Sequence, residues 1–264
     1  MSSNPVPLSN DDWALFLDVD GTLLEIAETP QSVHAPPSLK QLLEKLEARL
    51  EGALALVSGR SIANLDQLFA PLRLCASGIH GLERRDALGT FIDPAFDASA
   101  LAAAHEELDR FVQQHEGLLL EDKRYSLALH FRLAPELADR VHDTMRSVLA
   151  RLGPQFTLQA GKCVLELRPA AWNKGVAVRA FMQEAPFRGR TPLYIGDDVT
   201  DEDAFEVVNA LQGQSIRVGS GSDTHARHHL ADVDAVIRWL QDNPPVRHRF
   251  ASAPADRSGS GHAS

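Results

Sequence analysis

Two aspartates stand at the end of an apolar run near the beginning of the chain. Residues 15–24 read LFLDVDGTLL, which places Asp18 and Asp20 one residue apart and Gly21 directly after them. A carboxylate at the end of a buried strand is costly to desolvate unless a metal ion, a cation or a proton compensates it. Other segments of the chain are therefore expected to supply that compensation.

Short apolar runs elsewhere in the chain have the character of buried parallel strands. The runs at 14–19, 54–58 and 192–196 each lead into a polar or glycine-containing turn. Three segments between or after them have helical spacing: 38–50, 173–184 and 200–211. The first of these helices is expected to start with a capping box made by Ser38 and Gln41. The alternation predicts an α/β fold with a doubly wound, Rossmann-like parallel sheet.

The middle of the chain follows a different order. Segments 99–115 and 136–152 have helical spacing, and each is followed by two short strand-like runs. These runs are 117–122 and 125–132 after the first helix, and 155–160 and 162–168 after the second. Strands so close in sequence pair as antiparallel hairpins. We therefore expect an inserted α+β cap at 83–168, a core formed by 1–82 and 169–250, and a disordered tail at 251–264.

The cap strands alternate apolar and polar residues. Leu127 and Leu129 would face the cap helices, and Leu165 and Leu167 would do so from another strand. The opposite face would carry Ser126, His130, Arg132, Lys162, Glu166 and Arg168. One face of the cap is thus rich in hydrogen-bond donors and acceptors, which suits a hydroxyl-rich ligand.

Composition narrows the class of partner. The formal net charge of −10 over 264 residues makes a nucleic-acid surface unexpected. Cys75 and Cys163 each lie in an apolar stretch and are expected to be core residues and not a disulfide framework. We expect no secretory signal, no membrane span and no membrane partner, and we expect a cytoplasmic monomer.

Polar residues follow the predicted strands at the edge where an open α/β sheet binds ligands. Asp18 and Asp20 follow one strand, Ser58 follows another, and Asp197 and Asp198 follow a third. Lys174 begins a helix that would point to the same edge. Gathered carboxylates repel one another, and Mg²⁺ is the cation that oxygen ligands and an anionic substrate favour. The expected metal ligands are Asp18, Asp20, Asp197 and Asp198.

Taken in order, these segments resemble the motifs of the haloacid dehalogenase superfamily of phosphatases. The matching stretches are DVDGTL, the serine of VSGR, the lysine of NKG and GDDVTDEDAF. The resemblance implies that Asp18 attacks phosphorus to form an aspartyl-phosphate and that Asp20 is the general acid and base. Ser58, the backbone near Gly59 and Lys174 would hold the phosphoryl group. Asp198 and Asp201 would complete the metal shell or orient its waters.

Three further stretches resemble trehalose-6-phosphate phosphatases. They are SGIHGLE at 77–83, EDKRYSLALHFR at 121–132 and GKCVLELRP at 161–169. The resemblance implies magnesium-dependent hydrolysis of trehalose 6-phosphate to trehalose and phosphate. The substrate-binding residues it suggests are Arg60, His80, Glu121, Lys123, Arg132 and Glu166. Of these, Glu121, Lys123 and Glu166 would hold the glucose remote from the phosphate, and His80 would have a supporting role. Val19 stands where many relatives have an aromatic residue, which affects packing only.

The sequence leaves alternative functions open. The substrate could be another sugar phosphate such as sucrose phosphate, or the chain could be a phosphotransferase similar to phosphomannomutase. A non-catalytic sugar-phosphate sensor would be expected to lack the nucleophile or the acid, and both Asp18 and Asp20 are present. Arg60 could bind substrate or could pair with a nearby acidic residue.

Overall fold

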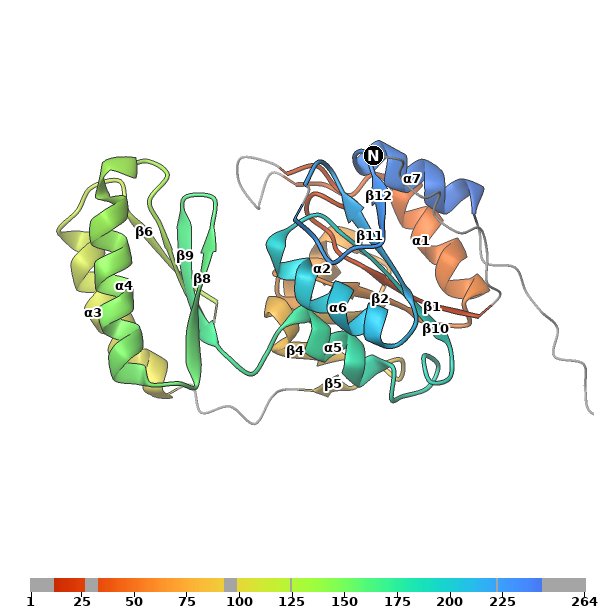
Figure 1. The fold of residues 1–264 in the computed structure, drawn as a ribbon, viewed down its shortest axis with the longest axis horizontal. Helices are drawn as coiled ribbons and strands as arrows, with labels where there is room; N and C mark the ends of the chain where they lie inside the picture. The colour runs from red at the N-terminus through yellow and green to blue at the C-terminus, as the bar shows by residue number, and fades with distance from the viewer. Residues whose placement is uncertain (1–11, 27–32, 93–98, 124, 222, 244–264) are drawn as a thin grey trace, which may run out of the picture.

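The chain folds into two lobes (Figure 1), one built on an eight-stranded sheet and the other on a four-stranded sheet. The computed structural model describes residues 12–26, 33–92, 99–123, 125–221 and 223–243. The predicted tail at 251–264 lies outside the described residues. Among the described residues, no helix is both long enough and apolar enough to cross a membrane.

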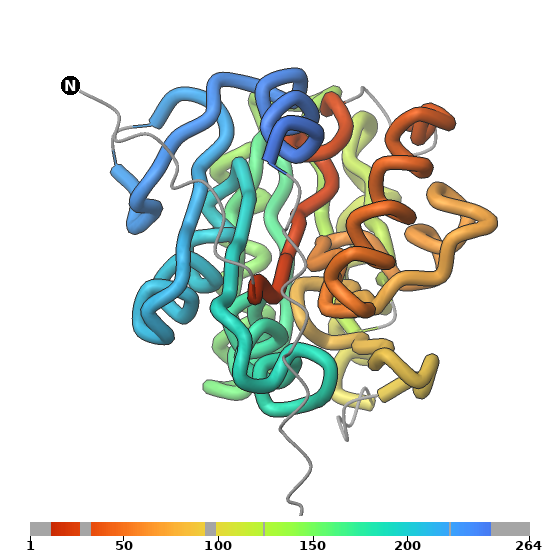
Figure 2. The backbone as a smooth tube through the Cα atoms, turned by 90° about the vertical axis from the view of Figure 1, so that its right-hand side faces the viewer, coloured from red at the N-terminus to blue at the C-terminus, as the bar shows by residue number. Residues whose placement is uncertain are grey.

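The larger lobe contains the predicted parallel sheet. Its strand order is β12-β11-β10-β1-β2-β3-β4-β5, and the pairs from β12 to β3 are all parallel. The parallel strands are β1 (Trp13–Leu17), β2 (Leu54–Val57), β3 (Cys75–Gly78), β10 (Thr191–Gly196), β11 (Gln214–Val218) and β12 (His228–Leu230). In Figure 2, which looks at this lobe with the smaller lobe behind it, β1 (red) lies in the middle of the sheet. The predicted strands at 14–19, 54–58 and 192–196 are confirmed as central, neighbouring strands.

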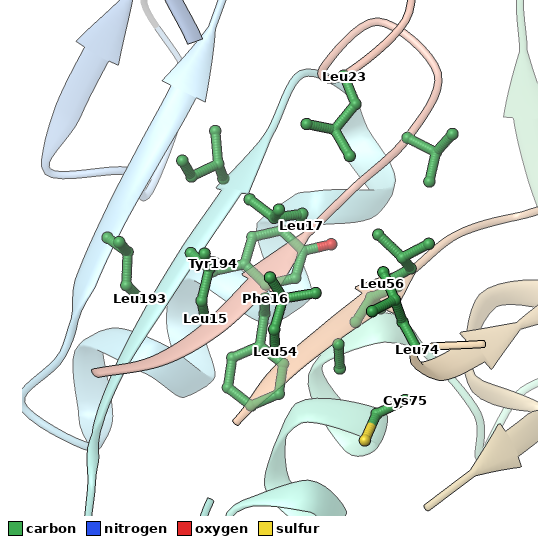
Figure 3. Close-up of a cluster of buried hydrophobic side chains, with 14 of the residues drawn as sticks. Leu15, Phe16, Leu17, Leu23, Leu54, Leu56, Leu74, Cys75, Leu193 and Tyr194 are labelled. Atoms are coloured by element: carbon green, nitrogen blue, oxygen red, sulfur yellow. The ribbon is translucent and has the colours of Figure 1, made fainter. Parts of the chain in front are cut away.

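Helices cover both faces of this sheet, so the doubly wound arrangement is confirmed. They are α1 (Pro37–Arg49), α2 (Ile62–Phe69), α5 (Lys174–Phe181), α6 (Glu202–Ala210) and α7 (Val233–Asp242). Trp13 of β1 stacks on Trp239 of α7, with 5.7 Å between ring centroids. Phe16 points to the other face and lies 6.0 Å from Phe181 of α5. The buried side chains of β1, β2 and β10 form the centre of the core (Figure 3).

The start of α1 differs from the prediction. The helix begins at Pro37, its N-cap is Pro36, and no side chain caps it. The predicted capping box of Ser38 and Gln41 is therefore wrong. Proline at the first helical position presets φ for the helix and has no N–H to satisfy, so Ser38 already lies within the first turn.

The smaller lobe has the predicted α+β order. Its elements are α3 (Ser99–Gln113), β6 (Leu119–Asp122), β7 (Leu127–His130), the 3₁₀ turn η3 (Pro135–Leu137), α4 (Ala138–Leu152), β8 (Phe156–Gly161) and β9 (Val164–Pro169). The sheet is antiparallel throughout, in the order β6-β7-β9-β8. Leu127, Leu129, Leu165 and Leu167 are buried in one cluster with α3 and α4, which confirms the predicted apolar face. Lys162 and Cys163, which were predicted to be in a strand, form the hairpin turn, where Cys163 has φ 61°.

The predicted start of the insert at residue 83 is too early. β4 (Glu83–Arg85) pairs antiparallel with β3, and β5 (Phe91–Ile92) pairs with β4, so both strands extend the core sheet. The sequence ERR of β4 has no apolar alternation, which is why the pattern of the chain did not indicate a strand there. The two lobes also touch directly, because Tyr125 of the smaller lobe packs with Ile79 and Leu82 of the larger one.

Candidate active site

The carboxyl ends of three adjacent strands bring the predicted reactive residues together. Asp18 follows β1, Ser58 follows β2 and Asp197 follows β10, and β1 lies between the other two strands. Lys174 is the first residue of α5, whose N-cap Asn173 accepts a hydrogen bond from the backbone N–H of Val176 at 2.8 Å. The register of the parallel sheet and one capped helix therefore place four polar groups at one edge.

A buried ionic cluster occupies this edge. The Lys174 ammonium donates to Asp18 Oδ1 at 2.8 Å and to Asp201 Oδ1 at 2.6 Å. One carboxylate oxygen from each of Asp18, Asp197 and Asp201 lies within 4.8 Å of the other two. Among the described residues, this is the one cluster of acidic, histidine or cysteine side chains that could hold a metal ion. Asp18 is 4 % exposed and Asp201 is fully buried.

The cluster has an excess of negative charge, with three carboxylates around one ammonium. Burial raises the pKa of Asp18 well above its usual value, and Lys174 offsets this only in part while Asp201 and Asp197 add to it. Burial and Asp201 raise the pKa of Asp197 to about 6. Burial opposes the charged form of Lys174, but Asp18 and Asp201 raise its pKa well above the usual value. A cation is what this set of oxygens needs in order to remain ionised.

Two glycines allow the carboxylates to approach. A Cβ atom on Gly21, which has φ 82°, would lie 2.1 Å from Asp197 Oδ2. A Cβ atom on Gly196 would lie 2.3 Å from Asp201 Cγ. A side chain at either position would displace the neighbouring aspartate side chain from the cluster.

Asp20 and Asp198, both expected as metal ligands, lie outside this group of carboxylates. Both oxygens of Asp20 accept from Arg60, with Nε to Oδ2 at 2.7 Å and Nη2 to Oδ1 at 2.6 Å. Asp198 caps the 3₁₀ turn η4 (Val199–Asp201) by accepting from the backbone N–H of Val199 at 2.5 Å. The structure brings in Asp201 instead, and it shows Arg60 paired with an acid, one of the two roles considered for it.

His80 lies next to Ser58 and Gly59, in a segment with a strained backbone. Ile79 and His80 both have positive φ, 46° and 52°, a conformation that is rare for residues with a side chain. The His80 N–H donates to the Ser58 carbonyl at 3.1 Å, and the ring covers Gly59 so closely that a Cβ there would lie 2.7 Å from it. Burial lowers the pKa of His80 to about 3, so the ring is neutral. Its buried Nδ1 atom has no hydrogen-bond partner among the described residues.

The polar face of the smaller lobe meets the larger lobe at His80. Glu166 Oε1 accepts from Ser126 at 2.5 Å, and its Oε2 accepts from Lys123 at 3.1 Å and lies 3.9 Å from His80 Nε2. Burial alone would raise the pKa of Glu166, but Lys123 and Ser126 contribute to a net lowering.

Two other predicted substrate-binding residues lie elsewhere on the smaller lobe. Glu121 pairs with His130 across β6 and β7 at 2.9 Å. Arg132 is exposed in the turn after β7. The structure thus brings His80, Lys123 and Glu166 together, while Arg132 is exposed.

Tyr194 is one member of the site that the sequence did not indicate, because it lies in an apolar strand. Its hydroxyl donates to Asp201 Oδ1 at 2.6 Å. A tyrosine within an aliphatic buried strand was the available signal, since a buried phenol needs a hydrogen-bond partner.

The larger lobe is a Rossmann-like core with aspartates and a lysine at its strand ends, and it is joined to an α+β cap. This combination is that of phosphatases of the haloacid dehalogenase class. The trehalose-phosphatase family model matches residues 16–235. The chain belongs to the trehalose-phosphatase family. It is 48% identical over 209 residues to a probable trehalose-phosphate phosphatase of Sinorhizobium fredii, covering 79% of this chain and 78% of that protein.

A second relative agrees with this assignment, and two solved structures are similar in fold. The chain is 45% identical to the trehalose-6-phosphate phosphatase of Escherichia coli, covering 87% of this chain and 85% of that protein. The C-terminal domain of the Candida albicans trehalose-6-phosphate phosphatase has the same fold, with a TM-score of 0.77 at 22% identity over 89% of this chain and 93% of that one. A trehalose-6-phosphate phosphatase related protein gives a TM-score of 0.69 at 29% identity, over 86% of this chain and 95% of that one.

Proposed function

We propose that this chain hydrolyses trehalose 6-phosphate to trehalose and orthophosphate. The observation that carries the proposal is that two polar clusters lie near the same residue, His80, whose ring is affected electrostatically by Glu166 of one and Lys174 of the other. The ionic cluster around Asp18 is suited to a phosphoryl group, and the donors and acceptors around Glu166 are suited to a sugar. His80 lies between them, 3.9 Å from Glu166. A phosphorylated disaccharide has a phosphate at one end and a hydroxyl-rich ring at the other.

In this proposal an oxygen of Asp18 forms a bond to phosphorus as the bond from phosphorus to the sugar oxygen breaks. Asp20, once it has turned from Arg60 and taken up a proton from solvent, gives that proton to the leaving oxygen, so trehalose departs neutral. Asp20 then takes a proton from the water that attacks the aspartyl-phosphate, which releases orthophosphate and restores Asp18. Ser58, the Gly59 backbone N–H and Lys174 hold the phosphoryl oxygens in both steps.

The oxygen-only donor set and its excess negative charge fit Mg²⁺. Asp18 and Asp197 are the side chains that would hold it. When bound, Mg²⁺ supplies charge stabilisation for the carboxylates and the phosphoryl group.

We further propose that the lobe formed by residues 99–169 is a cap that closes over the larger lobe. Closure would bring Glu121, Lys123 and Glu166 onto the glucose remote from the phosphate and would limit access of water. The support is that the polar face of its sheet carries these residues and that Tyr125 and Glu166 already touch the larger lobe. The cytoplasmic location and monomeric state expected from the sequence stay predictions.

The test is phosphate release from a panel of sugar phosphates that includes trehalose 6-phosphate and sucrose 6-phosphate, with and without Mg²⁺ after treatment with EDTA. Hydrolysis of trehalose 6-phosphate well above the other sugars, lost with EDTA and restored by Mg²⁺, is the expected result. Preference for another sugar phosphate would refute the proposed substrate. Transfer to a sugar without release of orthophosphate would indicate a phosphotransferase, and full activity in metal-stripped protein would refute the metal requirement.

A further inference from the structure

Asp201 is the most completely hydrogen-bonded carboxylate of the ionic cluster. Its Oδ2 accepts from the backbone N–H groups of Asp197 at 3.0 Å and Asp198 at 2.9 Å. Its Oδ1 accepts from Lys174 at 2.6 Å and from Tyr194 at 2.6 Å. A carboxylate has about four acceptor positions, and all of them are used here. Asp201 therefore acts mainly by holding its neighbours in place.

Lys174 is shared between two carboxylates, so its position depends on the balance between them. Its ammonium lies 2.8 Å from Asp18 Oδ1 and 2.6 Å from Asp201 Oδ1. The Tyr194 hydroxyl donates to the same Asp201 oxygen that Lys174 contacts. This second donor disperses part of the charge on that oxygen, which weakens its hold on the ammonium.

Packing alone does not explain the hydroxyl of Tyr194. The residue is fully buried in β10, its ring packs edge-on against Phe205 of α6 at 5.7 Å, and its register partners are Phe16 on β1 and Ser215 on β11. A phenylalanine would fill the same space without the cost of burying a polar group. Burial and Asp201 raise the pKa of Tyr194, so the phenol keeps the proton that it donates.

We infer that Tyr194 is a positioning residue that keeps the Lys174 ammonium available to Asp18 and to the phosphoryl group. Without the hydroxyl, Asp201 would draw Lys174 toward itself and away from the site of attack. The effect would be felt at the phosphate end of any substrate and not at the sugar end. The inference rests on the proposed phosphoryl transfer at Asp18, but it does not depend on which sugar is the natural substrate.

The test compares Tyr194→Phe with Ser215→Ala in the full chain with Mg²⁺. Ser215 is a matched control, because it is a fully buried hydroxyl in register with Tyr194 that donates to the uncharged Asn209 side chain at 2.8 Å. The measurements are the thermal midpoint, kcat and KM on trehalose 6-phosphate and on p-nitrophenyl phosphate, and the inhibition constant of orthophosphate.

For Tyr194→Phe we expect kcat/KM to fall about tenfold or more on both substrates, as for the loss of a hydrogen bond to a charged group. The inhibition constant of orthophosphate should rise by a similar factor, while Ser215→Ala keeps both values within about twofold of wild type. A purely structural role would lower the fraction of active molecules, which reduces kcat and leaves the inhibition constant unchanged. That result, or unchanged kinetics, would overturn the inference. Wild type that is active on the aryl phosphate but not on trehalose 6-phosphate would instead refute the proposed substrate and leave the Tyr194 comparison intact.

Discussion

Replacing His80 by asparagine should make the stability of the protein less sensitive to acid. Burial lowers the pKa of His80 from its ordinary 6.5 to about 3 in the folded protein. Between these two values the unfolded chain binds a proton at this position and the folded chain does not. The contribution of the neutral ring to the free energy of unfolding is therefore complete above pH 6.5 and is lost as the pH falls toward about 3.

The size of the effect follows from the shift. Each pH unit below the ordinary pKa costs the folded state about 1.4 kcal/mol, so the loss from this residue is about 1.4 kcal/mol at about pH 5.5 and about 2.7 kcal/mol at about pH 4.5. Asparagine does not titrate and tolerates the positive φ of 52° better than most residues. The variant will have its own free energy of unfolding at neutral pH. The free energy of unfolding of wild type minus that of the variant should fall by these amounts as the pH is lowered.

Urea unfolding of both proteins at about pH 7.5, 5.5 and 4.5 measures this difference directly. His229→Asn, at an exposed position of β12, controls for the removal of one histidine. Parallel pH dependences for wild type and His80→Asn would show that the ring titrates normally in the folded protein. The proposed neutral His80 between the phosphate and the sugar would then be wrong.

Three further predictions concern activity. Asp18→Asn should abolish turnover and the formation of an acid-stable phosphoenzyme while the circular dichroism spectrum is retained; a substantial remaining rate would exclude Asp18 as the nucleophile. Glu166→Gln should reduce kcat/KM on trehalose 6-phosphate by about ten- to a hundredfold and spare p-nitrophenyl phosphate, which has no second sugar to hold; equal losses on both would contradict the sugar-binding role. Gly21→Ala should nearly abolish activity, because its Cβ would lie 2.1 Å from Asp197 Oδ2 at φ 82°; activity within about twofold of wild type would show that the carboxylate cluster can widen at little cost.

The shared edge of the site could be predicted from the sequence because parallel strands impose it. The runs before Asp18, Ser58 and Asp197 are largely apolar, which indicates strands buried on both faces, and such strands end at a common edge. The cap face could be predicted in the same way, since side chains alternate along β7 and β9. These inferences need only local periodicity and one rule of sheet geometry.

The pairings within the site could not be predicted in this way. Asp20 and Arg60 are far apart in the chain, and whether the arginine meets an acid or a substrate depends on where two loops end in space. The same holds for Asp201, whose place in the ionic cluster depends on the turn η4 bending back over Gly196. The sequence did not predict strand β4, because its residues are charged and the groups that they bind lie elsewhere in the chain. Arg85, for example, donates hydrogen bonds to the Leu74 carbonyl and to Asp66.

The two polar clusters differ in charge, and this difference makes the two ends of the site suited to different parts of a ligand. Around Asp18 the carboxylates outnumber the single ammonium, so this end is incomplete without a cation and a phosphoryl group. Around Glu166 the charge is already balanced by Lys123, so this end offers hydrogen bonds without attracting a second anion. A protonated His80 between them would attract phosphate to the wrong end, whereas the neutral ring does not. In the proposed function, the neutral ring that this backbone holds against Gly59 would favour phosphate at Asp18 and sugar at Glu166.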